Sequence, residues 1–423
     1  MRPSRRTVLK VAGGVGLGGA GVAYWQRRWL RRRDDLDAIE TTLDVTVPTV
    51  PNPVTVTDAH LDAAYSWARE HVETTEREFP ESEVGSNRLE HATEDLTGQA
   101  PDEVDDGAAR HEALTQYTLA VSSSAMARGY PVETEDQPPS DELEAAHETL
   151  SDDLDAVDPR YAGESLTGTV VQAGHADSRW ATAASNHSRA ADYLADDRFS
   201  HDVTWETVEI GRFELDNAEW FREGLATDDA VDRTAALEDC DERLAEHIES
   251  ATDGVQWEYE PNVYARAYDR WRGVQMDHLG QPDHARDVGR VALVVLIQAE
   301  RATVAETLAE FDDVPGWGGS RDVDTELLDD AAELVAEKRA ASDRLAATAD
   351  AVGSDPLGAH LLRQAIQNVE QADSSLDRLR ENVRSDDSEQ WQAELDRAAL
   401  QYRGAAADAD AIPTIVSLVA DEG

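Results

Sequence analysis

The sequence has almost no cysteine and almost no lysine. Cys240 is the only cysteine, so an intramolecular disulfide and a cysteine-rich metal site are both excluded. It lies between Leu237 and Leu244 of a helical pattern, which predicts a small, partly buried hydrophobic residue. Lys10 and Lys338 are the only lysines, so arginine carries nearly all of the positive charge.

Motifs that mark common enzymes and cofactor sites are also missing. The sequence contains no glycine-rich phosphate loop, no Gly-x-Ser-x-Gly elbow and no His-Glu-x-x-His helix. A di-iron helical bundle needs two Glu-x-x-His motifs, and Glu144-Ala-Ala-His147 is the only one present. We therefore expect no cofactor. The sequence favours a non-catalytic role and leaves an enzyme as an open alternative.

Acidic residues are present in great excess. The chain has 88 acidic and 38 basic residues and a formal net charge of −50. This balance resembles that of proteins from extremely halophilic archaea. Such a charge opposes compaction in dilute buffer, whereas the Debye length of about 3 Å in molar salt screens the repulsion. Disorder is the alternative, but 40% hydrophobic residues and ten tryptophans argue against it. No basic stripe lies beyond residue 33, so nucleic acid is not an expected partner.

The N-terminus carries a targeting pattern. Ser4-Arg5-Arg6-Thr-Val-Leu-Lys10 is followed by a glycine-rich apolar run from Val11 to Trp25. The pattern resembles a twin-arginine export signal, in which Arg5 and Arg6 form the recognised pair. The resemblance implies that the twin-arginine translocase is a partner during export and that the folded domain is delivered outside the cytoplasm.

The same segment raises the question of a membrane anchor. Extended back to Thr7, the apolar run approaches the length of a spanning helix, roughly 17 to 25 residues. Trp25 and Trp29 would then form an interfacial belt. We therefore predict that residues 1–33 are an uncleaved transmembrane anchor that holds the domain at the outer side of the membrane. The alternative is secretion after cleavage at the weak Gly21-Val22-Ala23 site.

Residues 34–57 read as a linker. Pro48, Pro51 and Pro53 alternate with valine and threonine, which favours an extended stalk. A short edge strand is the alternative, although proline is unfavourable in a strand.

Residues 58–423 read as one acidic, all-helical domain, with a sub-boundary near 130–140. The run Val291 to Ala299 is apolar on nearly its whole circumference, so other helices must enclose it. We predict an all-α, multi-helix bundle of long amphipathic helices around a central helix near residues 282–311. Residues 202–215 fit either a helix or a strand, and we choose a helix. Residues 412–419 are predicted to be a short apolar tail that docks on the bundle.

An aromatic and locally basic region is the candidate ligand site. An anion or carbohydrate pocket is one interpretation, because arginines early in a helix favour a nearby anion or carboxylate. The alternative is that the aromatic side chains are core and that the arginines pair with acidic side chains. The candidate residues are Trp257, Tyr264, Tyr268, Trp271, Arg286, Arg290 and, in a separate glycine-rich break, Trp317.

Two Asp-His pairs beside one turn are the candidate metal site. Asp277-His278 and Asp283-His284 bring imidazole and carboxylate together, a combination that suits zinc. The alternative is that these residues face solvent beside the turn. His175-Ala-Asp177 with His187 is a weaker set of the same kind.

These observations give two hypotheses for function. The first is an exported, membrane-anchored halophilic protein that acts outside the cytoplasm as an interaction or envelope-associated module with protein partners at the cell surface. The second is a small-ligand or metal-binding protein, or an enzyme, that uses residues 257–290.

Overall fold

The computed structural model describes most of the chain from residue 34 to residue 420. The described residues are 34–78, 83–104, 107–129, 140–157, 159–195, 201–225, 227, 229–252, 282–310, 328, 331–381 and 388–420. The boundary predicted near residues 130–140 falls almost wholly outside them.

The described residues are almost entirely helical, which confirms the all-α class. The first half of the chain contains the helices α3 (Asp58–Glu78), α4 (Glu83–Leu96), η2 (Pro101–Glu103), α5 (Gly107–Gly129), α6 (Ser140–Ala156), α7 (Leu166–Ala195) and α8 (His201–Glu223). The second half contains α9 (Thr234–Thr252), α11 (Pro282–Asp287), α12 (Val291–Glu310), α13 (Glu333–Val352), α14 (Pro356–Glu381) and α15 (Ser388–Ala420). Within the described ranges, strand is limited to β1 (Ala162–Gly163), which pairs antiparallel with β2 (Val231–Asp232).

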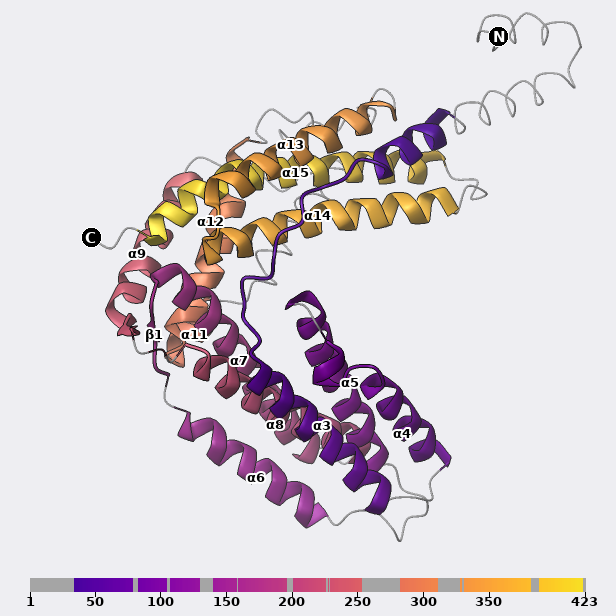
Figure 1. Cartoon of the computed structure of the whole chain (residues 1–423), viewed down its shortest axis with the longest axis vertical. Coiled ribbons are helices and arrows are strands. Elements are labelled where there is room, and N and C mark those ends of the chain that lie inside the picture. The colour runs from indigo at the N-terminus through magenta and orange to yellow at the C-terminus, as the bar shows by residue number, and fades with distance from the viewer. Residues whose placement is uncertain are drawn as a thin grey trace, which may run out of the picture.

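The helices form two arms that meet at one end (Figure 1). In the first arm α7 packs along α8, and α5 packs against both α4 and α8. In the second arm α15 packs against α13 and α14. The helix α12 joins the arms, because it contacts α7 of the first arm, α15 of the second arm and α9. Most of the buried apolar side chains of both arms form one continuous cluster, and two smaller clusters lie where α6 packs on α7 and α8.

The predicted central helix is present but broken near its start. α11 ends at Asp287, and Gly289 has a φ of 71°, a backbone conformation that glycine adopts without strain. The N–H of Arg290 donates to the carbonyl of Ala285 at 2.8 Å, which closes the end of α11. Val288, which lies in this break, is exposed. From Val291 onward the helix is enclosed, as predicted.

Close packing at the junction depends on a missing side chain. A Cβ atom added to Gly174 in α7 would lie 3.1 Å from the carbonyl oxygen of Ala292 and 3.0 Å from Cδ2 of Leu296, both in α12. Glycine at this position therefore lets α7 and α12 approach closely.

The prediction of a separate tail at the C-terminal end was wrong. Residues 412–419 are not a separate tail, because α15 continues through Pro413 to Ala420. A proline inside a helix removes the hydrogen bond to the carbonyl four residues earlier, which here belongs to Ala409. The Thr348 hydroxyl of α13 donates to that carbonyl at 2.8 Å. A neighbouring helix thus replaces the bond that Pro413 cannot make.

The predictions for two further segments had different outcomes. Residues 202–215 lie within α8, so the choice of helix is confirmed. Residues 34–57 are not extended throughout: residues 34–43 form a helix in which Ile39 is fully buried, and only the remainder is extended.

The prediction of a transmembrane helix is corrected for the part of the chain that the structure describes. None of its helices is long and apolar enough to cross a membrane. Even α12, the most apolar of them, carries Glu300, Arg301, Glu306 and Glu310. The segment on which the prediction rested, residues 1–33 with Arg5 and Arg6, lies outside the described residues.

Candidate functional site

An extended segment crosses the junction between the two arms. Residues 45–57, called the strap below, connect the helix of residues 34–43 to α3. The strap runs from beside α13, across α14, to the start of α3 (Figure 1). Pro48, Pro51 and Pro53 have no backbone N–H, so at these three positions the strap offers only carbonyl groups to its surroundings.

The main chain of Thr55 is held by the amide of Gln172. Its N–H donates to Oε1 of Gln172 at 2.9 Å, and its carbonyl accepts from Nε2 of Gln172 at 3.2 Å. The same Nε2 also donates to the carbonyl of Phe221 at 3.2 Å, which fixes the amide against α8. Gln172 is buried. One side chain of α7 therefore binds both backbone groups of one strap residue.

Other strap carbonyls are bound in the same way, by side chains and not by a neighbouring strand. Each accepts from a donor of α5, α13 or α14: Thr46 from Ser342 at 2.7 Å, Val50 from Arg363 at 3.2 Å, Val54 from His111 at 3.0 Å and Val56 from Arg110 at 2.8 Å. Both arms thus contribute donors to the strap.

The apolar contacts of the strap alternate along it. Val54 and Val56 are buried, whereas the side chain of Thr55 between them is exposed. This alternation is that of a β-strand with one covered face. The Asn52 side chain accepts from the N–H of Val54 at 3.1 Å and shapes the turn into this part. The site therefore combines main-chain recognition with two apolar positions.

Three histidines from three helices lie around Phe221, whose carbonyl accepts from the Gln172 amide that holds the strap. The ring of His60 lies 4.4 Å from the Phe221 ring and that of His175 lies 4.6 Å from it, both edge-on. The ring of His111 lies 6.0 Å from that of His175. Nε2 of His60 lies 2.9 Å from Oδ1 of Asn217. Helices α3, α5, α7 and α8 meet through this cluster.

Burial keeps these imidazoles uncharged. It lowers the pKa of His60 to about 4, against the opposing effect of the Asn217 hydrogen bond. Burial also lowers the pKa of His111, against the opposing effect of the hydrogen bond to the Val54 carbonyl, and lowers that of His175 more strongly; the positive charge of Arg179 adds to the lowering of both. At neutral pH the cluster is therefore a set of neutral donors and acceptors.

The charged groups around the cluster are already paired. Arg179 donates to both oxygens of Glu214, at 3.0 and 2.9 Å. Nε2 of His360 in α14 lies 2.7 Å from Oε1 of Glu300 in α12, which also accepts from Gln364. The junction is thus balanced in charge, unlike the strongly acidic chain as a whole.

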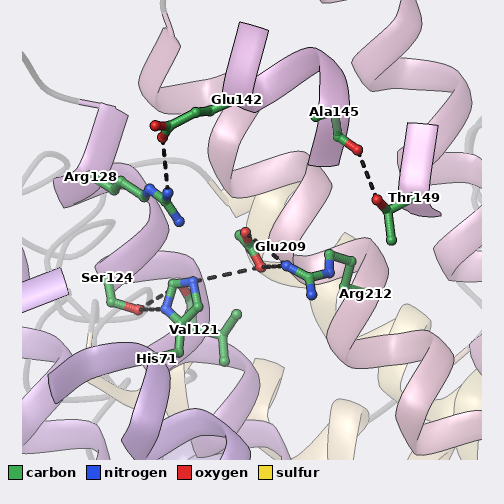
Figure 2. A network of polar contacts seen from close by, with 9 residues as sticks. All are labelled: His71, Val121, Ser124, Arg128, Glu142, Ala145, Thr149, Glu209 and Arg212. Carbon is green, nitrogen blue, oxygen red and sulfur yellow. Dashed lines mark hydrogen bonds and ion pairs between the residues drawn. The ribbon is translucent and has the colours of Figure 1, made fainter. Parts of the chain in front are cut away.

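A second polar network has the composition of a catalytic triad. Figure 2 shows His71 of α3 between Ser124 of α5 and Glu209 of α8. Nδ1 of His71 lies 2.7 Å from the Ser124 hydroxyl, and Nε2 lies 3.7 Å from Oε2 of Glu209, which also pairs with Arg212 at 3.2 Å.

The direction of the hydrogen bonds opposes nucleophilic catalysis. The Ser124 hydroxyl donates its hydrogen to the carbonyl of Val121 at 3.0 Å, so in the contact with His71 its oxygen accepts a hydrogen bond from Nδ1–H. A serine nucleophile must instead give its proton to the imidazole. Ser124 is also fully buried within α5. We interpret the network as a structural link between α3, α5 and α8.

The predicted ligand-site arginines both have carboxylate partners. Arg286 binds both oxygens of Asp241 at 2.7 Å and Asp283 at 2.6 Å. Arg290 is buried, lies 3.7 Å from Asp177 and stacks over Trp180 at 3.8 Å. Asp177 also binds Arg222 at 3.0 Å.

The remaining residues of the two predicted sites are not described, so both sites stay predictions. Trp257, Tyr264, Tyr268, Trp271, Trp317, Asp277, His278 and the side chain of His284 lie outside the described part. Within it, no group of three or more potential ligand side chains could hold a metal ion. The three residues of the weaker candidate metal site do not lie together. His175 belongs to the Phe221 cluster, Asp177 pairs with two arginines, and His187 stacks on His147 at 4.2 Å.

Sequence analysis missed the strap site. The available signal was a polar residue, Gln172, inside the otherwise small and apolar run Val170 to Gly174. A polar side chain on a buried helical face needs a hydrogen-bond partner. The partner, Thr55, lies 117 residues away in sequence, and no local pattern identifies it.

Comparison with known proteins gives one match. Residues 216–421 match the model of a family described as a domain of unknown function (DUF8264). No curated protein and no solved structure matches the chain. The matched region begins inside α8 and includes the second arm, so Glu300 and Arg363 lie within it, whereas His111 and Gln172 do not.

Proposed function

We propose that this protein is exported and works outside the cytoplasm, in concentrated salt, as an interaction module that binds an extended polypeptide segment at the strap site. The observation that carries the proposal is the pair of hydrogen bonds from the Gln172 amide to the N–H and carbonyl of Thr55. The strap is the segment that occupies this site within the chain itself.

The geometry defines the class of ligand. The contacts through Gln172, His111, Arg110 and Arg363 are made to the main chain, which is common to all sequences. Selectivity is left to the two covered positions, Val54 and Val56, which accept β-branched residues. The expected ligand is therefore an extended segment with β-branched residues at alternate positions, bound as in other main-chain recognition modes.

The composition supports the proposed setting. A net charge of −50 favours a protein that functions where salt screens repulsion. Arg5 and Arg6 supply the export signature.

Replacement of both Arg5 and Arg6 by lysine is expected to leave the protein in the cytoplasm, as checked by cell fractionation. The matched control is replacement of Arg31 and Arg32 by lysine, which lie outside the signature and should not change fractionation.

Binding is tested with a labelled peptide of residues 45–57 and the full chain in molar salt. The resident strap competes at a high effective concentration, so it is weakened by the double substitution Val54→Asp and Val56→Asp, which leaves the helices unchanged. We expect fluorescence anisotropy to show binding of the peptide to this variant and much weaker binding to the unsubstituted chain.

Two controls make the test specific. A peptide methylated at the N–H of Thr55 cannot donate to Gln172, and Gln172→Ala removes both hydrogen bonds. Each should weaken binding by about tenfold or more, since each hydrogen bond contributes about 0.5–1.5 kcal/mol and leaves a partner unsatisfied when lost. Undiminished binding in both controls, or no binding to the weakened variant, would contradict the proposal.

A further inference from the structure

Several titratable and charged side chains lie around the junction that the strap crosses. The titratable and charged groups that face this junction come from six helices: Asp58, which pairs with Arg110, and His60 of α3, Arg110 and His111 of α5, His175 and Arg179 of α7, Glu214 of α8, Glu300 of α12, and His360 and Arg363 of α14. One of the imidazoles, His111, binds the strap directly.

The nearby carboxylates are already bound to other side chains, so they would compensate little of the positive charge that protonation adds to the histidines. Glu214 is held by Arg179 through both of its oxygens, and Glu300 is held by His360 and Gln364. Protonated His60, His111 and His175 would therefore repel one another and Arg179 inside a region of low polarity. Release of the strap frees His111, the imidazole that binds it, gives this imidazole access to water and relieves the repulsion.

We propose that the junction is a proton-sensitive latch: acidification releases the strap and uncovers the site for an extended segment. This inference rests on the proposed function and adds its regulation. The latch is closed at neutral pH, where the histidines are neutral and His111 donates to the carbonyl of Val54.

The direction of the pH effect follows from linkage. Burial lowers the pKa of His60, His111 and His175 in the closed state, whereas a released histidine returns to about 6.5. The open state therefore binds more protons below about pH 6.5. Each released histidine raises the opening constant by up to about tenfold per pH unit. Above about pH 6.5 a released histidine is neutral as well, so protonation no longer favours the open state over the closed state.

Strap release can be measured in the full chain in molar salt. A spin label is placed on the exposed strap position by Thr49→Cys, in a Cys240→Ala background that removes the only native thiol. The ratio of mobile to immobile label is then recorded from about pH 7.5 to about pH 5. We expect this ratio to rise at least about tenfold while helical circular dichroism is largely retained.

Substitutions separate the latch from general acid effects. His175→Gln, and separately His111→Gln, whose amide still donates to the Val54 carbonyl, should flatten the pH dependence. The control His91→Asn changes an exposed histidine of α4 and should leave it unaltered. A label that stays immobile at pH 5 with the helices intact, or identical pH curves in the glutamine variants, would overturn the latch. Peptide binding to the Val54→Asp and Val56→Asp variant at pH 7.5 does not depend on protonation, so the proposed function can stand if the latch fails.

Discussion

The Thr348 hydroxyl donates to the carbonyl of Ala409 at 2.8 Å, the carbonyl that Pro413 leaves without its helical partner. Both Thr348 and Ala409 are buried, so water cannot replace this hydrogen bond. The continuity of α15 through a proline therefore depends on a side chain of α13.

This relationship can be measured with a double-mutant cycle. Thr348→Val should lower the free energy of unfolding by about 1–2 kcal/mol, because it leaves a buried carbonyl unsatisfied. In a Pro413→Ala background the helix regains its own N–H donor, and the same substitution should cost about 1 kcal/mol less. Denaturant unfolding in molar salt gives all four values. Equal costs in the two backgrounds would show that the hydroxyl does not replace the missing bond.

The only lysine of the described residues is buried in an ion pair. Nζ of Lys338 in α13 lies 2.8 Å from Oδ2 of Asp373 in α14, whose other oxygen accepts from Tyr402 of α15 at 2.6 Å. Asp373 is 27% exposed, so water partly compensates it when the lysine is removed. We expect Lys338→Met to lower the free energy of unfolding by about 2 kcal/mol, below the 3–5 kcal/mol typical of a fully buried pair. The neighbouring exposed Arg339→Met is the control and should change it by less than about 0.5 kcal/mol.

Asp216 of α8 should destabilise the fold at neutral pH. Burial, together with the negative charge of Glu219, raises its pKa to about 6. A carboxyl group with a raised pKa stabilises the folded state when protonated, and this contribution is lost as pH rises from about 4 through 6. Asp216→Asn should therefore raise the free energy of unfolding by about 1–2 kcal/mol at pH 7, after allowance for partial exposure.

The pH dependence distinguishes this effect from a packing effect. The gain from Asp216→Asn should disappear near pH 4, where the native carboxyl group is also neutral. Glu223→Gln removes a negative charge from an exposed position of the same helix and serves as the control. A gain of equal size at both pH values would point to packing and contradict the electrostatic explanation.

Salt should be required for the fold as a whole. Dialysis of the protein from molar to dilute salt is expected to reduce helical circular dichroism, because a net charge of −50 is then poorly screened. Sucrose at matched osmolality should not restore the signal, since it adds no screening ions. Full helicity in dilute buffer would contradict the halophilic interpretation.

The sequence predicted the helices well where a strong local signal marks their ends. α5 ends at Gly129 and α14 begins at Pro356, residue types that commonly stand at these ends of a helix. Prediction failed where a distant partner decides the outcome. Residues 412–419 were expected to form a short tail, and the Thr348 contact from α13 explains why the helix continues through Pro413 instead.

The strap site could not have been predicted for the same reason. Its donors Arg110, Gln172 and Arg363 come from three helices spread over most of the chain. Sequence periodicity identifies which face of a helix is buried, but it does not say which extended segment lies against that face. The local clusters that attracted attention, such as Arg286 with Asp283, pair with each other or with nearby helices.

The strap also sets an order for folding. Thr46 and Val50 bind Ser342 and Arg363, contacts that span 296 and 313 residues of the chain. Contacts of such sequence separation close the largest loops and form late, and during synthesis they cannot form before Arg363 has left the ribosome. The strap residues are therefore among the last to reach their native positions, and they dock only after the chain has been made as far as Arg363.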